Sequence, residues 1–341
     1  MLTTNANDPS AVLDVDTSRE VEVANGLRVR YCRRLVRHSV SPMLLRLLPS
    51  YVRWGDIVHL TAVYSFPTIP TLLACKILRK PIVWSPRGAL QRWEGSTRLR
   101  EKALWERVCQ VVAPKPLVLH VTSEEEARES LERLPGVEVA VISNGIEILE
   151  KVTHIHGEGM LRLLYLGRLH PKKGIENLLA ACAMLNNDSG FPWSLTIAGA
   201  GDPGYTRNIR ARIKELALSG RVRMVGWVAG EAKQKLFHKA DILVVPSFTE
   251  NFGIVVAEAL AHGVPVIASK GTPWSRMEDI GCGLWLGNDP ASLKEGIERM
   301  SRMPLREMGL SGREWMKREF SWSRVAESMM ALYEGIQDDA K

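Results

Sequence analysis

Two glutamates, eight residues apart, are the side chains in this sequence whose surroundings most suggest chemistry. Glu250 lies in a polar loop, and Glu258 lies in a stretch of alanine and aliphatic residues. A carboxylate in so apolar a segment needs hydrogen-bond donors, which sugar hydroxyls or a structural arginine would supply. A helix that begins near Gly253 would offer free backbone N–H groups from Phe252 to Val255 and a positive dipole end, which suits a phosphate. The pattern suggests a phosphorylated, hydroxyl-rich ligand; one structural glutamate in an ordinary βαβ unit is an equally open interpretation.

The elements around these glutamates have a clear pattern. The apolar, β-branched run 242–245 predicts a buried strand, and residues 246–251 form a polar loop. Residues 253–262 suit a helix that Gly263 closes, and 264–268 predict a second buried strand. The unit is therefore expected in a parallel sheet, with its loop at the carboxyl edge where α/β proteins bind ligands.

This stretch resembles the donor-binding signature of family 4 glycosyltransferases. The signature is Glu, any residue, Phe or Tyr, then Gly, with a second Glu eight positions after the first; Glu250, Phe252, Gly253 and Glu258 fill it. The resemblance implies the GT-B fold, an α/β fold in which two doubly wound Rossmann-like domains face a central cleft. It also implies that Glu250 holds the hydroxyls of the donor sugar and steadies an oxocarbenium-like transition state, and that Glu258 binds the ribose hydroxyls.

A second loop carries basic residues. Residues 167–174 follow a predicted strand at 161–166 and precede a predicted helix at 175–185. Taken alone the pattern is weak, because surface Arg and Lys are common. Family members carry Gly-Arg and then Lys-Gly at this spacing, so the resemblance implies that Arg168 and Lys173 hold the donor diphosphate. The predicted catalytic residues are Glu250, Arg168 and Lys173. The predicted donor-binding residues are Arg168, Lys173, Glu250, Asn251, Phe252, Gly253, Ile254, Val255 and Glu258.

The first half resembles the family more weakly. Strand and helix patterns alternate over residues 27–144, beginning with a strand at Leu27–Tyr31, which predicts a parallel, doubly wound sheet. Residues 1–4 look like the family's second strand, so the first βα unit and its glycine-rich loop are expected to be missing. Many members carry a His after the strand that matches residues 81–84; Arg87 stands in that neighbourhood, and no residue takes the His role.

The resemblance also predicts how the domains are divided. Residues 1–150 are expected to form an acceptor-side Rossmann-like domain, and 151–320 a Rossmann-like domain that binds the nucleotide-sugar donor. Residues 321–341 are expected to form a helix that crosses back to the first domain. The linker is placed at about 146–160. A chain of 341 residues has room for two such domains.

Composition limits the class of protein. The five cysteines are odd in number and widely spaced, which favours a reduced, cytosolic protein without a disulfide framework. No apolar run approaches the roughly 18 residues of a membrane span, and the amino terminus lacks the pattern of a signal peptide. Residues 27–120 hold 17 Lys plus Arg against 4 Asp plus Glu, a balance of +13, whereas the whole chain is +7. This charge indicates a solvated face, or attraction to anionic lipid or an acidic acceptor; no groove-reading motif favours nucleic acid.

Together these features predict a retaining hexosyltransferase of polysaccharide or lipopolysaccharide biosynthesis. It would move a sugar from a nucleotide-sugar donor to an acceptor glycan or a lipid-linked sugar. No metal and no cofactor beyond the nucleotide-diphosphate sugar is expected, because Arg168, Lys173 and the helix start can supply positive charge to the leaving group. A cytoplasmic protein is expected, with peripheral contact on the inner face of the plasma membrane. The alternatives are a catalytically inactive donor-binding protein or truncated chain, and a GT-B sugar-nucleotide epimerase.

Overall fold

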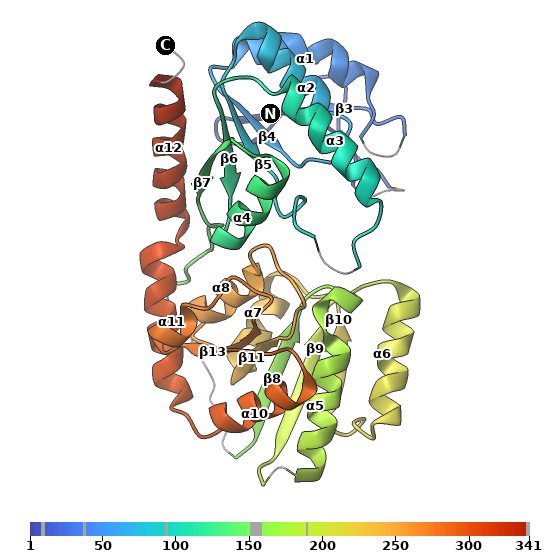
Figure 1. The fold of residues 1–341 in the computed structure, drawn as a ribbon. Helices are drawn as coiled ribbons and strands as arrows, with labels where there is room; N and C mark the ends of the chain where they lie inside the picture. Colours follow the sequence, from blue (N-terminus) through green and yellow to red (C-terminus); the bar gives the residue numbers. More distant parts are fainter. Residues whose placement is uncertain (8–10, 37–38, 93–94, 151–158, 189, 339–341) are drawn as a thin grey trace. The chain divides into compact units, whose positions relative to one another are not determined.

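The computed structural model describes residues 1–7, 11–36, 39–92, 95–150, 159–188 and 190–338 (Figure 1). The chain divides into two compact units. Unit 1 comprises Met1–Ile142 with Ser328–Lys341, and unit 2 comprises Ser143–Glu327. Most of the predicted linker, residues 151–158, lies outside the described residues.

A parallel sheet in the order β4-β5-β6-β7 forms the centre of unit 1 within the described residues. Its strands are β4 (Val58–Thr61), β5 (Ile82–Ser85), β6 (Leu117–Val121) and β7 (Glu138–Val141). The helices of this unit are α1 (Pro42–Trp54), α2 (Thr68–Leu78), α3 (Leu99–Val112) and α4 (Glu124–Arg133).

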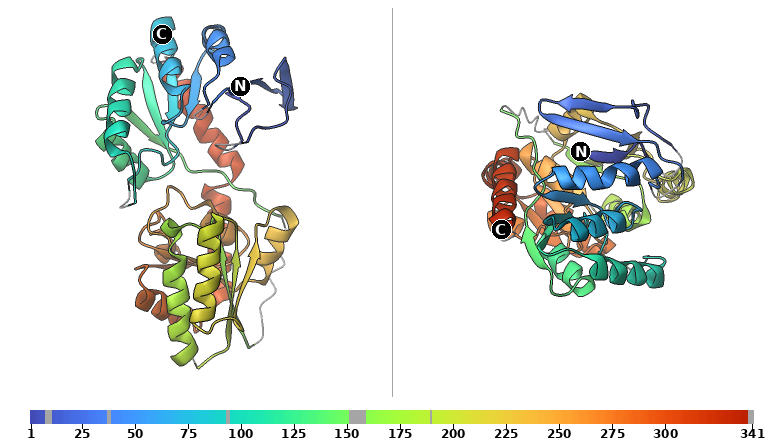
Figure 2. Two further views of the ribbon diagram at one scale, coloured as in Figure 1. Left: turned by 90° about the vertical axis from the view of Figure 1, so that its right-hand side faces the viewer. Right: turned by 90° about the horizontal axis from the view of Figure 1, so that it is seen from above.

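Strand β5 shows how the two faces of this sheet are covered. Its alternate residues Ile82 and Trp84 belong to the core that α1 to α4 share. Val83, between them, packs in a separate cluster with Ile336 of α12 (Trp322–Asp338). Figure 2 shows this helix beside the sheet, on the face opposite α1 and α2. Helix α4 begins as its sequence suggests, with the Ser123 side chain accepting the Glu126 backbone N–H at 3.1 Å.

The strand expected at Leu27–Tyr31 is present and a helix follows it, as the alternating pattern predicted. It is not part of this sheet, so the prediction of one parallel, doubly wound sheet is wrong for this strand. It forms β3 (Leu27–Cys32) in a separate small sheet with the order β1-β3-β2. β1 (Leu2–Thr4) runs parallel to β3, whereas β2 (Glu20–Ala24) runs antiparallel to it. Only two residues, Asn25 and Gly26, join β2 to β3, and Gly26 has a φ of 74°. A two-residue turn of this kind makes a hairpin and leaves no room for a crossover helix.

Unit 2 is built on a parallel sheet whose described strands follow the order β10-β9-β8-β11-β12-β13. These are β8 (Leu161–Leu166), β9 (Trp193–Ala198), β10 (Val222–Gly226), β11 (Ile242–Val245), β12 (Val266–Ser269) and β13 (Gly283–Leu286). One core joins the sheet to α5 (Ile175–Asp188), α6 (Pro203–Glu215) and α10 (Pro290–Met300). A second core on the other face joins it to α7 (Gly230–Lys239), α8 (Ile254–Ala261), α9 (Met277–Ile280) and α11 (Leu305–Glu319). Helices therefore cover both faces, as in a doubly wound fold.

The strand order locates the place where such a sheet binds ligands. From β8 the chain adds β9 and β10 on one side, and then returns to add β11, β12 and β13 on the other. The order thus reverses between β8 and β11, and open α/β sheets bind ligands beyond the carboxyl ends of the strands at this switch point. The segments that follow these two strands are the predicted basic loop and the predicted glutamate loop.

Candidate active site

Two loops of unit 2 meet at the switch point: the basic loop (residues 167–174) after β8, and the acidic loop (residues 246–253) after β11. The Phe248 N–H donates to the Lys172 carbonyl at 2.9 Å. Gly174 has a φ of 64°, and a Cβ on it would lie 2.1 Å from the Pro246 oxygen. No residue larger than glycine fits this approach, so Gly174 sets how closely the two loops pack.

A third segment, which follows β9, supports the basic loop from the other side. A Cβ on Gly199 would lie 1.8 Å from the Gly167 oxygen, and one on Gly201 would lie 2.0 Å from the Leu169 oxygen. The Leu169 N–H donates to the Ala200 carbonyl at 2.9 Å. The basic loop is therefore held by backbone contacts on both sides, which fixes the direction of its side chains.

Lys173 and Glu250, one predicted catalytic residue from each loop, are in direct contact. The Lys173 Nζ is bonded to the Glu250 Oε1, and the Ser247 hydroxyl donates to the same oxygen at 2.7 Å. Their side chains are 18% and 11% exposed. The Glu250 backbone N–H donates to the Gly271 carbonyl at 2.8 Å, which anchors the acidic loop to the segment after β12. A cation and a carboxylate thus lie together, mostly shielded from water, at the carboxyl edge of the sheet.

Glu258 lies one turn into α8 and has a cationic partner of its own. The Lys233 Nζ of α7 lies 2.5 Å from the Glu258 Oε1. Both side chains remain about a quarter exposed, and both line a cavity of about 630 Å³ together with Gly230, Ile254 and His262. The carboxylate is held by one lysine and can still reach a ligand in this cavity.

The remaining predicted residues differ in what they can contribute. Phe252 is 5% exposed and packs against Trp274 and Phe320, so only its backbone can serve a ligand. Gly253, with a φ of 71°, leads into α8, and a Cβ there would lie 3.3 Å from the Trp274 indole nitrogen. Asn251 and Val255 are half-buried, whereas Ile254 is 42% exposed at the start of α8.

Arg168 is the predicted residue that the structure does not join to the others. Its side chain is exposed and makes no ion pair with another described residue. Its position is fixed through the backbone, because the Tyr165 hydroxyl donates to the Arg168 carbonyl at 3.0 Å. Arg168 and Lys173 would therefore act together only if both side chains contacted the same ligand.

His170 shows that the basic loop carries concentrated positive charge. Its Nδ1 accepts the Lys172 backbone N–H at 3.1 Å. Burial lowers the pKa of His170, and the charges of Arg168, Lys172 and Lys173 lower the pKa further. The three cations repel a further positive charge on His170, and a bound anion would reduce this repulsion.

Sequence reasoning missed Ser247, Tyr165 and Lys233. Ser247 stands in the Pro-Ser pair before the glutamate motif, so the motif held a signal for it. Lys233 meets Glu258 from another helix, 25 positions away, and no spacing in the sequence marks that contact. Residues 1–7, 11–36, 39–92, 95–150, 159–188 and 190–338 hold no group of three or more His, Cys, Asp or Glu side chains placed to bind a metal ion.

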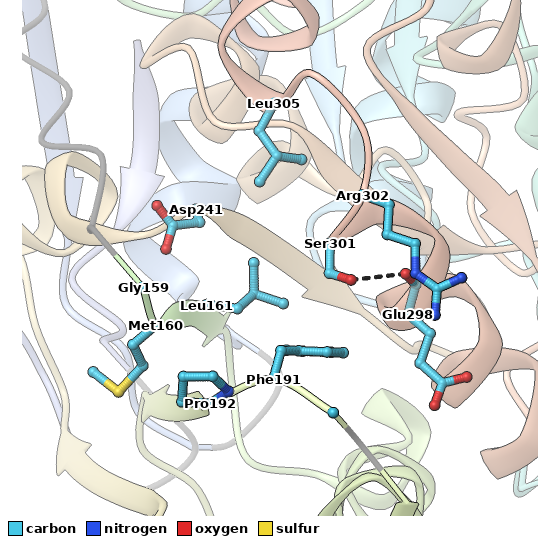
Figure 3. Close-up of a pocket in the computed structure, with 11 residues that line it drawn as sticks. Gly159, Met160, Leu161, Phe191, Pro192, Asp241, Glu298, Ser301, Arg302 and Leu305 are labelled. Carbon is cyan, nitrogen blue, oxygen red and sulfur yellow. Dashed lines mark hydrogen bonds between the residues drawn. The ribbon is translucent and has the colours of Figure 1, made fainter.

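A second cavity of unit 2, of about 540 Å³, lies at the opposite edge of the sheet (Figure 3). Leu161 opens β8, Pro192 precedes β9 and Asp241 precedes β11, so this cavity is at the amino ends of the strands. The Arg162 guanidinium pairs with Asp241 at 2.7 Å, which joins the starts of β8 and β11. This edge is structural, and the candidate site remains at the carboxyl ends.

Comparison with known proteins agrees with the position of this site. The family model of glycosyl transferases group 1 matches residues 150–314, which contain both loops, Lys233 and Glu258. Over these residues, just under half of the chain, the sequence is similar to group 1 glycosyl transferases. An uncharacterised glycosyltransferase of Methanocaldococcus jannaschii is 29% identical over 222 residues, or 60% of this chain and 56% of that protein. A D-inositol 3-phosphate glycosyltransferase of Geodermatophilus obscurus is 28% identical over 248 residues, or 67% of this chain and 55% of that protein. The matched regions thus span little more than half the length of these relatives.

Solved structures show the fold. Sucrose-phosphate synthase of Thermosynechococcus elongatus has a TM-score of 0.72 at 23% identity, and covers 98% of this chain and 87% of its own. The Anabaena protein HepE, solved in complex with UDP, has a TM-score of 0.72 at 17% identity, and covers 91% of this chain and 86% of its own. The chain therefore has the GT-B fold, as its motifs predicted. In the part of the chain that the structure describes, no helix has both the length and the apolar character needed to span a bilayer.

Proposed function

We propose that this protein is a retaining hexosyltransferase that moves a sugar from a nucleotide-diphosphate donor to a glycan or a lipid-linked sugar. The observation that supports this most is the Lys173–Glu250 contact at the switch point. A diphosphate bound at this edge would contact the cation, and the hydroxyls of its sugar would contact the carboxylate. The flanking helix start of α8 adds backbone N–H groups directed at an anion.

In the proposed reaction the acceptor oxygen bonds to the anomeric carbon as that carbon's bond to the diphosphate oxygen breaks. The acceptor's proton passes to an oxygen of the leaving diphosphate, so no protein base is required. Lys173, Arg168 and the start of α8 would stabilise the negative charge that develops on the leaving group. Glu250 would hold the sugar hydroxyls and the positive charge near the anomeric carbon, and Glu258 would hold the ribose.

Metal independence is part of the proposal. The positive charge that a divalent ion would give the diphosphate is supplied by Arg168 and Lys173, and Lys172 lies between them on the loop. After burial, the charges of Arg168, Lys172 and Lys173 also lower the pKa of His170, which supports a positive potential at this loop. Activity that persists in a chelator is the expected result.

The proposal also includes where the protein works, in the cytoplasm and in peripheral contact with the inner face of the plasma membrane. Five exposed aliphatic side chains support this: Leu73 and Ile77 on α2, and Leu104, Val108 and Val111 on α3. The two helices pack against each other, and the Lys76 Nζ donates to the Val111 carbonyl at 2.6 Å. Both helices lie within residues 27–120, the stretch that carries the basic excess, and such charge favours anionic lipid.

The first test is a screen of nucleotide sugars for thermal stabilisation. A ligand at 100 times its dissociation constant adds about 2.7 kcal/mol to the stability of the folded state. The stabilising donor is then incubated with glycan and lipid-linked acceptors, with and without a chelator, and the configuration of the product is read by NMR. A donor that binds and is never consumed would favour the inactive donor-binding alternative, and a donor converted without any acceptor to an isomeric sugar nucleotide would favour the epimerase.

A further inference from the structure

Unit 1 contains a cavity of about 740 Å³ that no motif of the sequence marks. Aliphatic and aromatic side chains make up most of its lining: Val36, Val40, Tyr64, Phe66 and Trp105. A volume of this size accommodates a ligand of tens of atoms.

The cavity lies at the edge of the unit 1 sheet where ligands are expected. Tyr64 and Phe66 are in the segment that follows β4, so they extend from the carboxyl edge of that sheet. Trp105 and Lys102 come from the first half of α3. The cavity therefore has the same relation to its sheet as the candidate donor site has to the sheet of unit 2.

Its aromatic side chains have satisfied polar atoms and offer their rings to an occupant. The Trp105 indole N–H donates to the Val63 carbonyl at 2.9 Å. The Tyr64 hydroxyl donates to the buried Glu106 carboxylate and accepts from the Arg92 guanidinium at 2.9 Å. What remains facing the cavity is apolar surface, which is unfavourable to leave in water.

Cations border this apolar space. The Lys102 Nζ lies 5.3 Å from the centre of the Tyr64 ring, and the Arg92 guanidinium carbon lies 5.8 Å from it. Glu106, the buried carboxylate nearby, is already bonded to Arg92 and Tyr64. Burial lowers the pKa of Lys102, and the charge of Arg92 lowers it further. An anion beside Lys102 would offset both effects.

The rim continues the apolar character toward solvent. Leu35 and Val36 are 60% and 59% exposed, and Leu99 is 53% exposed. Arg98 and Glu101, which also line the cavity, are exposed and lie 3.9 Å apart, a separation at which an ion pair contributes little. An occupant therefore meets apolar walls, an apolar rim and a cationic edge.

We propose that this cavity binds the apolar part of an anionic amphiphile, an alkyl chain next to a phosphate, with the phosphate beside Lys102. Resting on the proposed function, the inference is that the acceptor is of this class, a sugar or hydroxyl carried on a lipid phosphate. A neutral, fully polar glycan would leave the apolar walls and rim uncovered. A lipid without a charged group would leave Lys102 without an anion, since the nearby Glu106 is already paired with Arg92.

The test uses the full chain and three soluble probes below their micelle-forming concentrations: decyl phosphate, decyl maltoside and butyl phosphate. Binding is measured by calorimetry. Decyl phosphate should bind more tightly than butyl phosphate by more than about a hundredfold, because six further methylene groups are buried. It should also bind more tightly than decyl maltoside. Equal binding of the two phosphates would show that the cavity does not take the chain, and equal binding of the two decyl probes would show that the anion is not recognised.

Two cavity variants and one control variant locate the effect. Val40→Asp puts a charge into the apolar wall and should weaken decyl phosphate binding about tenfold or more. Val111→Asp makes the same change at a site 72% exposed on α3 and outside the cavity, and should leave the affinity unchanged. Lys102→Met keeps the size of the side chain and should remove the preference for decyl phosphate over decyl maltoside. Parental binding and preference in both cavity variants would overturn the proposal. If Val40→Asp fails to fold, Lys102→Met and the probe comparison still decide it.

These measurements separate the inference from the proposed function, since they need no turnover. A protein that binds decyl phosphate through Val40 and Lys102 and transfers no sugar would refute the proposed function and leave the cavity assignment standing. A protein that transfers sugar equally well to short, uncharged acceptors and ignores decyl phosphate would refute the inference alone.

Discussion

The candidate donor site of unit 2 and the apolar cavity of unit 1 both lie at the carboxyl edge of a parallel sheet, yet they are built in different ways. In unit 2, glycines let backbone segments approach within van der Waals distance, and two lysine–glutamate contacts join neighbouring elements. In unit 1, side chains from the segment before α1, the loop after β4 and the start of α3 form an apolar space with a cationic edge. The first construction suits a chemical group that is the same in every ligand, such as a diphosphate. The second suits a group that differs between ligands.

Removing the cations of the basic loop should give the largest effect. Lys173→Ala and Arg168→Ala should each lower turnover by roughly a hundredfold or more, as expected for the loss of about 3 kcal/mol of stabilisation at a developing anion. The loss should be greater for Lys173, because its removal also leaves the mostly buried Glu250 without its cation. Sugar transfer, or donor hydrolysis, is the measurement.

Lys214→Ala, at an exposed position on α6, is the matched control and should keep parental turnover. Added magnesium should not rescue either loop variant, and a chelator should not inhibit the parent. Near-parental turnover of both loop variants would mean that the diphosphate is held elsewhere.

The close approach of the two loops can be broken at one position. Gly174→Ala adds a Cβ at 2.1 Å from the Pro246 oxygen, in a backbone conformation with φ of 64°. We expect a loss of about 1–3 kcal/mol in the free energy of unfolding, together with weaker donor binding, because the basic loop must move away from the acidic loop. Gly220→Ala is the control, since nothing lies within 4 Å of a Cβ there. Equal melting temperatures for the two variants would show that the loop contact is not as tight as described.

The strands and helices that carry the candidate site of unit 2 could be predicted from the sequence, because they depend on local spacing. The strand at residues 161–166, the glutamate motif and the glycine-bounded basic loop each occupy one continuous stretch. Lys233 could not be predicted, since it meets Glu258 only after two helices pack. The three-stranded sheet of unit 1 was not predicted, although Asn25-Gly26 is a strong hairpin signal. The alternating strand and helix pattern that begins at residue 27 favoured a parallel sheet instead. The cavity of unit 1 had no local signal at all, because residues 36 to 105 supply its walls from three separate elements.

Substitutions in the Lys233–Glu258 pair should have a smaller effect than those in the basic loop. Glu258→Ala should weaken the binding of the nucleoside diphosphate and of the complete donor by about tenfold, as expected for the loss of a charged hydrogen-bond partner worth about 1.5 kcal/mol. Lys233→Met should weaken both by less, since the carboxylate stays and loses only the cation that orients it. Calorimetry with nucleotide alone and with the nucleotide sugar measures this. Unchanged affinity of Glu258→Ala would refute the ribose assignment.

Vesicle binding tests whether the exposed aliphatic side chains of α2 and α3 contact a membrane surface, separately from the binding of a single amphiphile in the cavity. The protein should bind anionic vesicles at low ionic strength and release them as salt screens the attraction. Val111→Asp and Leu104→Asp should weaken vesicle binding while leaving decyl phosphate binding intact. Neutral vesicles of the same size are the control. A protein that ignores anionic vesicles at low salt would contradict the membrane contact and leave the cavity untouched.

The smallest expected effect concerns pH and a histidine of unit 1. The His59 Nδ1 is 2.5 Å from the Tyr333 hydroxyl, and its Nε2 is 2.7 Å from the Ser85 hydroxyl. Burial, and after it the charges of His120 and Arg87, lower the pKa of His59 to about 4 from its ordinary 6.5. Between these values the unfolded chain binds more protons than the folded one, so the free energy of unfolding falls as the pH drops from about 7 toward 4.

His59→Gln removes this titration and should flatten the fall in stability between pH 7 and pH 5, measured by urea unfolding at several pH values. Part of the slope should persist, because burial also lowers the pKa of the neighbouring His120. Tyr333→Phe is the matched control: it removes the hydroxyl that His59 contacts but no group that titrates in this range, so its curve should lie below the parent's and run nearly parallel to it. If the His59→Gln curve also runs parallel to the parent's, His59 is not kept neutral by its surroundings in unit 1.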